Sequence, residues 1–206
     1  MKRSNSMVPV LMATVLLVSL LGSSAVMASP RAHDGGLFLR LSAGGGSATS
    51  TLESGSGKAE FSGSAGDLNF AIGGIVSPNL ALHGTLFGWL MSDPDLSITG
   101  LGSGQVNADV DLTAIGGGFT YFFMPSNIYL SASLGIGKLS IDAGSLVGET
   151  DNGMVMDVTL GKEWWVGDSW GLGVAGGFNY HSVPDGDIDE NWSGASFVIR
   201  FSATHN

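Results

Sequence analysis

Residues 128–136 read IYLSASLGI, and this stretch decides the fold class. From Ile128 to Ile136 every second residue is apolar, and most of the residues between them are small or polar. A period of two places the apolar side chains on one face of a β-strand, whereas apolar positions on a helix recur every three or four residues. We therefore predict a β-strand with one apolar face.

The same alternation appears on both sides of this stretch. Glycine, asparagine, aspartate and serine separate short apolar runs, and no run after the first 30 residues approaches the length of a membrane-spanning helix. Eight strands are predicted, at Gly36–Thr49, Asp67–Val76, Leu80–Met91, Asn107–Phe123, Ile128–Ile141, Gly153–Val166, Trp170–His181 and Ser193–Phe201.

The connections between these strands alternate between short and long. The short ones contain residues that favour turns. An alternation of short periplasmic turns with long outer loops is typical of outer-membrane β-barrels. The short connections are Ser77–Asn79, Met124–Asn127 and Gly167–Ser169, and the long ones are Ser50–Gly66, Ser92–Val106, Asp142–Asn152 and Ser182–Trp192.

The two faces of the predicted strands differ in polarity. One face is apolar, and the other carries Arg40, Asp67, Asn69, His83, Asp157, Glu163, Asn179 and Arg200. Charges of both signs suit a packed lumen better than a lipid surface, so we place the apolar face outward. Hydrocarbon requires every backbone polar group to be paired, and strands achieve this only in a closed barrel. The sequence predicts an all-β fold, an eight-stranded antiparallel up-and-down transmembrane β-barrel over residues 36–206.

Aromatic residues gather near the tight-turn ends of the strands, where we expect them to form the periplasmic aromatic girdle. The run Gly116–Gly118 blurs the alternation in the fourth strand, and a β-bulge there would exchange its two faces. The predicted girdle residues are Tyr121, Phe122, Phe123, Tyr129, Trp164, Trp165 and Trp170.

The first residues indicate export to the bacterial outer membrane. A positively charged start precedes an apolar run from Val8 to Leu21, and small residues follow it. This pattern predicts a signal peptide over residues 1–28 that is cleaved after Ala28. The alternative is a retained transmembrane helix, for which the apolar run is short. Residues 29–35 would then form a short N-terminal segment.

The composition argues against several classes of site. The chain has no cysteine, which removes disulfides, thiolate nucleophiles and cysteine metal sites. It has 18 acidic and 8 basic residues, and the cations are scattered, so we expect no nucleic-acid partner. There is no zinc motif and no phosphate-binding loop, and we expect neither a metal nor a cofactor.

The last predicted strand carries a distinctive pattern. Residues 193–199 read SGASFVI, and Phe201 continues the alternation. This stretch resembles the assembly signal at the end of outer-membrane barrels, with Gly194, Phe197, Ile199 and Phe201 in its pattern. The tail after Phe201 departs from barrels that end on the aromatic residue. The resemblance implies the barrel assembly machinery and outer-membrane lipid as partners.

Together with the eight strands, this pattern resembles the small outer-membrane barrels that include OmpA-like and OmpX-like proteins. Such barrels serve in adhesion, structural anchoring, narrow pores and lipid A modification, so the resemblance does not select a function. We expect a structural or surface-interaction role through the outer loops, for a surface ligand that the sequence does not identify, and no enzymatic activity. A narrow pore for small solutes or cations is the alternative, and a lipid-modifying barrel enzyme is a second one.

Three charged residues form a candidate cluster in the lumen. Their positions in the alternation place Arg40, Glu163 and Arg200 on the lumen face, near the periplasmic end of their strands. The first and last strands pair when the barrel closes, which brings Arg40 and Arg200 close together. Two confined cations need an anion between them, and Glu163 can serve. An eight-stranded lumen is just wide enough for side chains, which favours a buried ion cluster over a gate.

Four aspartates are expected on the lumen face near the outer ends of the strands, and residues 185–190 add further carboxylates. Hard cations prefer such oxygen ligands. The last loop lacks the spacing of a calcium-binding loop, so we expect a solvated acidic outer rim and no metal site. The four aspartates are Asp67, Asp109, Asp111 and Asp157.

One histidine raises the question of catalysis. Small outer-membrane barrels include lipid A deacylases that use a histidine, a serine two residues later and a glutamate. Here Ser182 follows His181 directly, and Glu190 lies further along the chain. Adjacent strand residues point to opposite faces, so we expect no catalytic site at this position. His83 is expected to be a packing residue in the lumen.

Overall fold

The computed structural model describes residues 33–205 except 56, 145 and 187–189. The predicted signal peptide at residues 1–28 therefore lies outside the described residues. None of the described residues belongs to a helix with the length and apolarity that a membrane crossing needs. The described strands are β1 (Leu37–Ser54), β2 (Gly57–Ser77), β3 (Leu80–Ser92), β4 (Asp95–Ile98), β5 (Gly102–Gln105), β6 (Asp109–Phe123), β7 (Ile128–Asp142), β8 (Val147–Glu149), β9 (Gly153–Trp165), β10 (Trp170–Asp185) and β11 (Glu190–His205).

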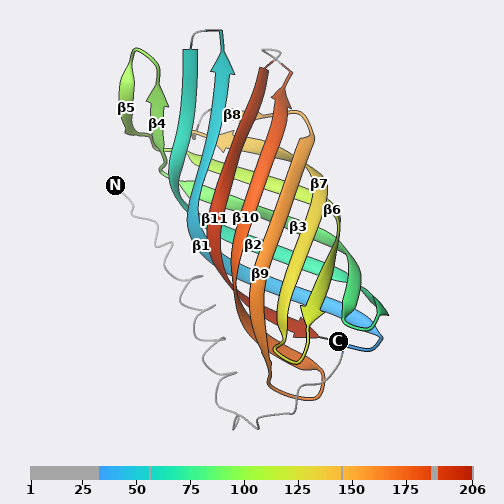
Figure 1. Ribbon diagram of the computed structural model, residues 1–206. Coiled ribbons are helices and arrows are strands. Elements are labelled where there is room, and N and C mark those ends of the chain that lie inside the picture. The colour runs from blue at the N-terminus through green and yellow to red at the C-terminus, as the bar shows by residue number, and fades with distance from the viewer. Residues whose placement is uncertain (1–32, 56, 145, 187–189, 206) are drawn as a thin grey trace.

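Eight of these strands form a closed antiparallel ring (Figure 1). Its order is β1-β2-β3-β6-β7-β9-β10-β11, and pairing of β1 with β11 closes it. Each ring strand therefore has a hydrogen-bonded neighbour on both sides, which removes the open edges that hydrocarbon does not tolerate. The predicted all-β, eight-stranded antiparallel barrel is confirmed.

Two of the predicted long loops are largely strand. β1 and β2 pair continuously up to Ser54 and Gly57, and β10 and β11 pair up to Asp185 and Glu190. These pairs project from the end of the barrel opposite the tight turns (Figure 1). Their outer segments carry polar or small residues on the outward face, so an alternation of apolar and polar residues does not mark them.

The other two predicted long loops contain short strands. The hairpin of β4 and β5 pairs with the outer part of β2, and β8 pairs with the outer end of β7. β3 ends at Ser92, opposite the middle of β2, and this leaves the outer part of β2 free for the hairpin. The barrel therefore extends beyond its ring as a sheet on this side.

Exposure of the side chains follows the predicted alternation. In β3, Leu82 and Leu86 are exposed on the outer surface, whereas His83 and Phe87 are buried in the lumen. β6 keeps a continuous register with both neighbours through its glycine run, so the bulge considered there is not present in β6. An irregularity in register lies instead in β2, between residues 75 and 77.

Four of the seven residues predicted to form the aromatic girdle face outward, as such a girdle requires. The other three were placed on the wrong face, because neighbouring aromatic residues along a strand point to opposite sides. The exposed members are Tyr121, Phe123, Trp164 and Trp170. Those on the lumen side are Phe122 and Tyr129, which are fully buried, and Trp165, whose ring lies 5.0 Å from that of His33.

Candidate functional site in the barrel lumen

The segment that precedes β1 lies against the tight turns at one end of the barrel. The ring of His33 stacks on that of Phe122 with 3.5 Å between centroids, and its Nε2 lies 2.9 Å from Oδ1 of Asn127. The backbone N–H of Asn79 donates to the carbonyl of His33 at 2.7 Å, and Oδ1 of Asn79 accepts from the backbone N–H of His33 at 3.2 Å. Because Asn79 and Asn127 belong to different tight turns, His33 joins the β2–β3 turn to the β6–β7 turn.

Arg40 and Glu163 form a buried ion pair near this end. Nε of Arg40 lies 3.4 Å from Oε1 of Glu163, and both side chains are almost completely buried. The hydroxyl of Thr204 donates to the same oxygen of Glu163 at 2.6 Å and accepts from Nε of Arg40 at 3.0 Å. The guanidinium carbon of Arg40 lies 3.9 Å from the ring centroid of Tyr129, and an aromatic face attracts a cation at this range.

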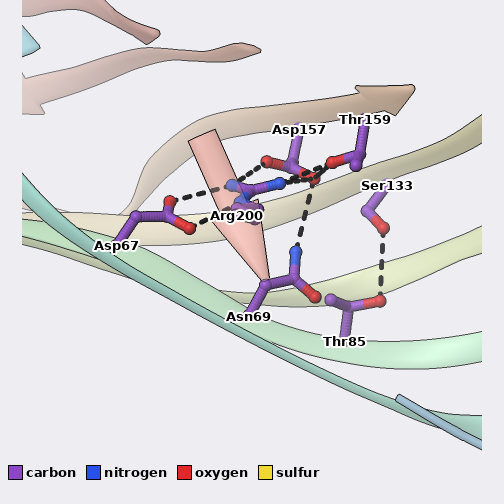
Figure 2. Close-up of polar contacts among 7 residues, drawn as sticks. All are labelled: Asp67, Asn69, Thr85, Ser133, Asp157, Thr159 and Arg200. Carbon is purple, nitrogen blue, oxygen red and sulfur yellow. Dashed lines mark hydrogen bonds and ion pairs between the residues drawn. The ribbon is translucent and has the colours of Figure 1, made fainter. Parts of the chain in front are cut away.

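Arg200 forms a second layer, between two aspartates (Figure 2). Its Nε and Nη2 donate to Asp67, the latter to Oδ2 at 2.8 Å. Its Nη1 and Nη2 donate to Asp157 at 3.1 and 2.6 Å, and Nη1 also donates to Thr159. Asn69 adds a donor to Asp157 at 3.3 Å. The five N–H donors of a guanidinium are thus all used.

The predicted cluster of Arg40, Glu163 and Arg200 is therefore corrected to two separate layers. Glu163 pairs with Arg40, whereas Arg200 pairs with aspartates. The register explains the separation, because Arg40 lies opposite Thr204 on β11, four residues beyond Arg200. Four residues span about 13 Å along a strand, which is too far for the three side chains to meet.

The predicted acidic outer rim is also corrected. Asp67 and Asp157 are buried in the Arg200 layer and do not form a solvated rim. Asp109 and Asp111 lie at the outer end of β6 but on its outward face, since Val110 and its alternate neighbours face the lumen. The predicted parity of β6 was wrong at this end, because the glycine run gives no guide to the faces.

Two glycines make room for these lumen side chains. A Cβ atom at Gly177 would lie 2.8 Å from the guanidinium of Arg200, and one at Gly161 would lie 2.6 Å from the ring of Tyr129. Both approaches are closer than real Cβ atoms allow, so a side chain at either position would displace its neighbour. Nothing in the alternation of the sequence identifies these two glycines among the others.

Apolar side chains fill the outer part of the lumen. Phe61 and Trp192 stack with 5.6 Å between ring centroids, and Nε1 of Trp192 donates to Asp185 at 3.2 Å. Sequence reasoning missed this cluster, because part of it lies in segments predicted to be loops. We call it the outer apolar cluster, and its buried members are Ala48, Phe61, Ala65, Phe87, Trp89, Met91, Val110, Leu112, Ala114, Leu139, Val155, Val183 and Trp192.

The residues considered for catalysis do not come together. His181 is fully buried in the lumen, with Nε2 3.0 Å from Oγ of Ser50, whereas Ser182 belongs to the opposite face of β10. Glu190 begins β11 opposite Asp185. Within the described part of the chain, no three histidine or carboxylate side chains converge in a way that could hold a metal ion. Residues 187–189 of the acidic last loop lie outside the described residues.

The other predicted residues take simpler positions. His83 is buried between two hydroxyls, with Nδ1 2.8 Å from Thr85 and Nε2 3.0 Å from Thr120. In the stretch predicted to be an assembly signal, Gly194 lies beside the ring of His181. The three alternating apolar residues of its pattern point outward, with exposures of 64% for Phe197, 68% for Ile199 and 58% for Phe201. The tail beyond this stretch continues β11 to His205 and pairs with β1 and β10.

Comparison with known proteins supports the fold through similarity to solved structures. No protein-family model matches the sequence, and no curated protein matches it. Neisserial surface protein A (NspA) matches 84% of this chain and 99% of its own, with 16% identity and a TM-score of 0.53. OprG from Pseudomonas aeruginosa matches with 13% identity, covering 84% of this chain and 96% of its own, at a TM-score of 0.47.

A third match is Ail of Yersinia pestis, the attachment invasion locus protein, in complex with the heparin analogue sucrose octasulfate. It has 11% identity over 82% of this chain and 99% of its own, with a TM-score of 0.43.

The match to NspA and the closed ring of eight strands together assign the fold. The chain has the fold of the small eight-stranded outer-membrane barrels.

Proposed function

We propose that the chain is an exported, non-enzymatic barrel of the bacterial outer membrane whose lumen is closed and whose outer strands serve in surface interaction. The observation that carries this proposal is the filled lumen. His33 and its aromatic neighbours, the Arg40 layer, the Arg200 layer and the outer apolar cluster follow one another along the lumen. A barrel whose interior is occupied in this way is suited to holding its outer strands at the cell surface and not to conducting solutes.

The part available for interaction is the outer end. The β1–β2 pair, the β10–β11 pair and the β4–β5 hairpin project there as strands, so they present a surface held in place by backbone hydrogen bonds. Ordered elements of this kind bind with little loss of conformational entropy. The surface ligand would engage these strands and leave the lumen unchanged.

The charge of this outer surface favours cationic partners. Lys58 lies 2.7 Å from Glu60, and Lys138 lies 2.6 Å from Glu149, so both lysines are already paired with carboxylates. The Glu60 carboxylate raises the pKa of Lys58, and Lys58 in turn lowers the pKa of Glu60, so this pair stays charged near neutral pH. Further carboxylates such as Asp95 are exposed nearby. Complementary charge speeds encounter between partners at low salt.

The test uses purified protein in lipid nanodiscs with poly-L-lysine as the cationic probe. We expect binding that weakens as salt rises, because exposed charges are screened within about 8 Å at physiological ionic strength. Asp93→Asn/Asp95→Asn protein should bind more weakly, and Asp168→Asn, in a tight turn at the other end, should bind like the wild type. Equal binding by all three proteins would contradict the proposed outer surface.

The same preparation tests the closed lumen. Liposomes that contain the protein should swell no faster than empty liposomes in small neutral solutes. Swelling at the rate of a narrow pore would favour the alternative function, solute passage. Release of fatty acid from lipid A by the wild type would favour the second alternative, a lipid-modifying barrel enzyme.

A further inference from the structure

Five buried polar atoms in one region of the lumen have no hydrogen-bond partner among the described residues. They are both amide atoms of Asn179, Nδ1 of His181, Oγ of Ser196 and Nε1 of Trp89. Asn179, His181 and Ser196 are fully buried. A buried polar group without a partner is costly, and nearly all such groups in native proteins bond to protein or to ordered water. This gathering of atoms points to a guest that both donates and accepts hydrogen bonds.

The atoms lie close enough together to share a small guest. Asn179 is directly opposite Ser196 across β10 and β11, and His181 follows Asn179 by two residues on the same face. Directly opposite residues have Cβ atoms about 4.5–5.5 Å apart, a gap that one water molecule can bridge. The ring of Trp89 lies 5.7 Å from that of His181, which places the indole beside the same group.

The neighbouring charges exclude an anion as the guest. Asn179 also lies opposite Asp157, so the polar group adjoins the Arg200 layer. That layer holds the carboxyl groups of Asp67 and Asp157 against the single guanidinium of Arg200, so no cationic group is left over to receive an anion. A second anion in a lumen of low dielectric would be repelled, whereas a neutral donor would be stabilised there.

We infer that Asn179, His181, Ser196 and Trp89 form an internal water site between the Arg200 layer and the outer apolar cluster. Two water molecules suffice, since a buried water makes about three hydrogen bonds. Water can donate to Oδ1 of Asn179 and accept from the indole N–H of Trp89. Because Trp89 belongs to the outer apolar cluster, this water is enclosed and is not part of a conduit.

The decisive experiment is nuclear magnetic resonance on the full barrel in lipid nanodiscs. Water cross-relaxation should reach the side-chain amide protons of Asn179 and the indole proton of Trp89. The Nε proton of Arg200 is the control, because it donates to Asp67 and should show no such signal. A missing water signal at Asn179, with its amide resonances assigned, overturns the inference.

Two variants give a second readout. In Ser196→Ala the midpoint of urea unfolding should fall, because a hydroxyl bonded to water is lost; if the hydroxyl has no partner, its removal raises the midpoint instead. In Asn179→Leu the leucine should expel the water, so the Trp89 signal disappears while the Arg200 resonance stays in place. A rise in the Ser196→Ala midpoint, or an unchanged Trp89 signal in Asn179→Leu, contradicts the site.

A last control distinguishes water from a cation drawn by the two neighbouring carboxyl groups. The unfolding midpoint of the wild type should be the same in sodium chloride as in N-methylglucamine chloride at equal ionic strength. A higher midpoint in sodium would identify a bound cation and overturn the assignment to water.

Discussion

Glu163 is the only carboxylate within ion-pair distance of Arg40 among the described residues. Its side chain contacts residues of both β1 and β11. Its oxygen accepts from Thr204 and lies 3.4 Å from the hydroxyl of Ser202. Tyr129 attracts the cation of the pair but cannot neutralise it. The side chain therefore decides whether the charge of Arg40 is balanced inside the lumen.

Replacing Glu163 with alanine should lower the free energy of unfolding by about 3–5 kcal/mol, because it leaves a buried cation without its anion. The measurement is urea unfolding in lipid vesicles. Glu149→Ala is the matched control: it removes the carboxylate of an exposed pair with Lys138, and exposed pairs contribute about 0–1 kcal/mol. Similar losses in the two variants would mean that the Arg40 layer is solvated.

β11 shows at the scale of an element how parity separates lipid from lumen. Ile199 is exposed on the outer surface, whereas its neighbours Val198 and Arg200 are buried. Replacing Ile199 with arginine should cost about 2–4 kcal/mol if the position lies near the bilayer midplane, and less near an interface. Urea unfolding in vesicles measures this cost.

A labelling series checks the same parity directly. The natural chain has no cysteine, so single cysteines can be placed at 198 and 199 without removing any other. A fluorophore at 199 should be quenched by brominated lipid, and one at 198 should be shielded from it. Equal quenching at both positions would contradict the assigned faces.

The β4–β5 hairpin carries a second test at this scale. An epitope tag inserted between Gly100 and Leu101, at the tip of the hairpin, should be reachable by antibody on intact cells, because the hairpin lies at the end opposite the tight turns. The control insertion at Asp168, in the β9–β10 turn, should be labelled only after the outer membrane is permeabilised. The reverse pattern would invert the orientation of the barrel.

Elements were predictable where one face meets lipid. All eight ring strands were found because alternation of apolar and polar residues records that contact, as in IYLSASLGI. The last five residues of β1, the outer half of β2 and the strands β4, β5 and β8 were missed, since outside the membrane no such alternation is required. The partners in the lumen were missed for another reason: the pairing of Arg200 with Asp67 joins residues 133 apart, and only the register brings them together.

At the scale of the whole molecule, the proposed closure of the barrel rests on barriers in series. The stack of His33 on Phe122 lies at one end, the outer apolar cluster occupies the other, and two ion layers lie in the lumen. Barriers of different chemistry are not removed by the same substitution. An ion pair can be broken by the loss of one charge, whereas an apolar plug yields only to smaller side chains that admit water.

This arrangement makes a distinct prediction for conductance in planar bilayers. Wild-type protein should show no steady current. Arg200→Ala should also stay closed despite its loss of stability, because the outer apolar cluster still excludes ions. Conductance should appear only when all four barriers are weakened together, by Arg200→Ala, Arg40→Ala, His33→Ala and Phe87→Ala/Trp89→Ala combined, because any remaining barrier in the series still blocks the lumen. Phe87→Ala/Trp89→Ala without the charge change is the matched control and should conduct little. If Arg200→Ala alone conducts steadily, the ion layer is a gate and the outer apolar cluster is no seal, so the pore would replace the closed barrel as the function of this fold.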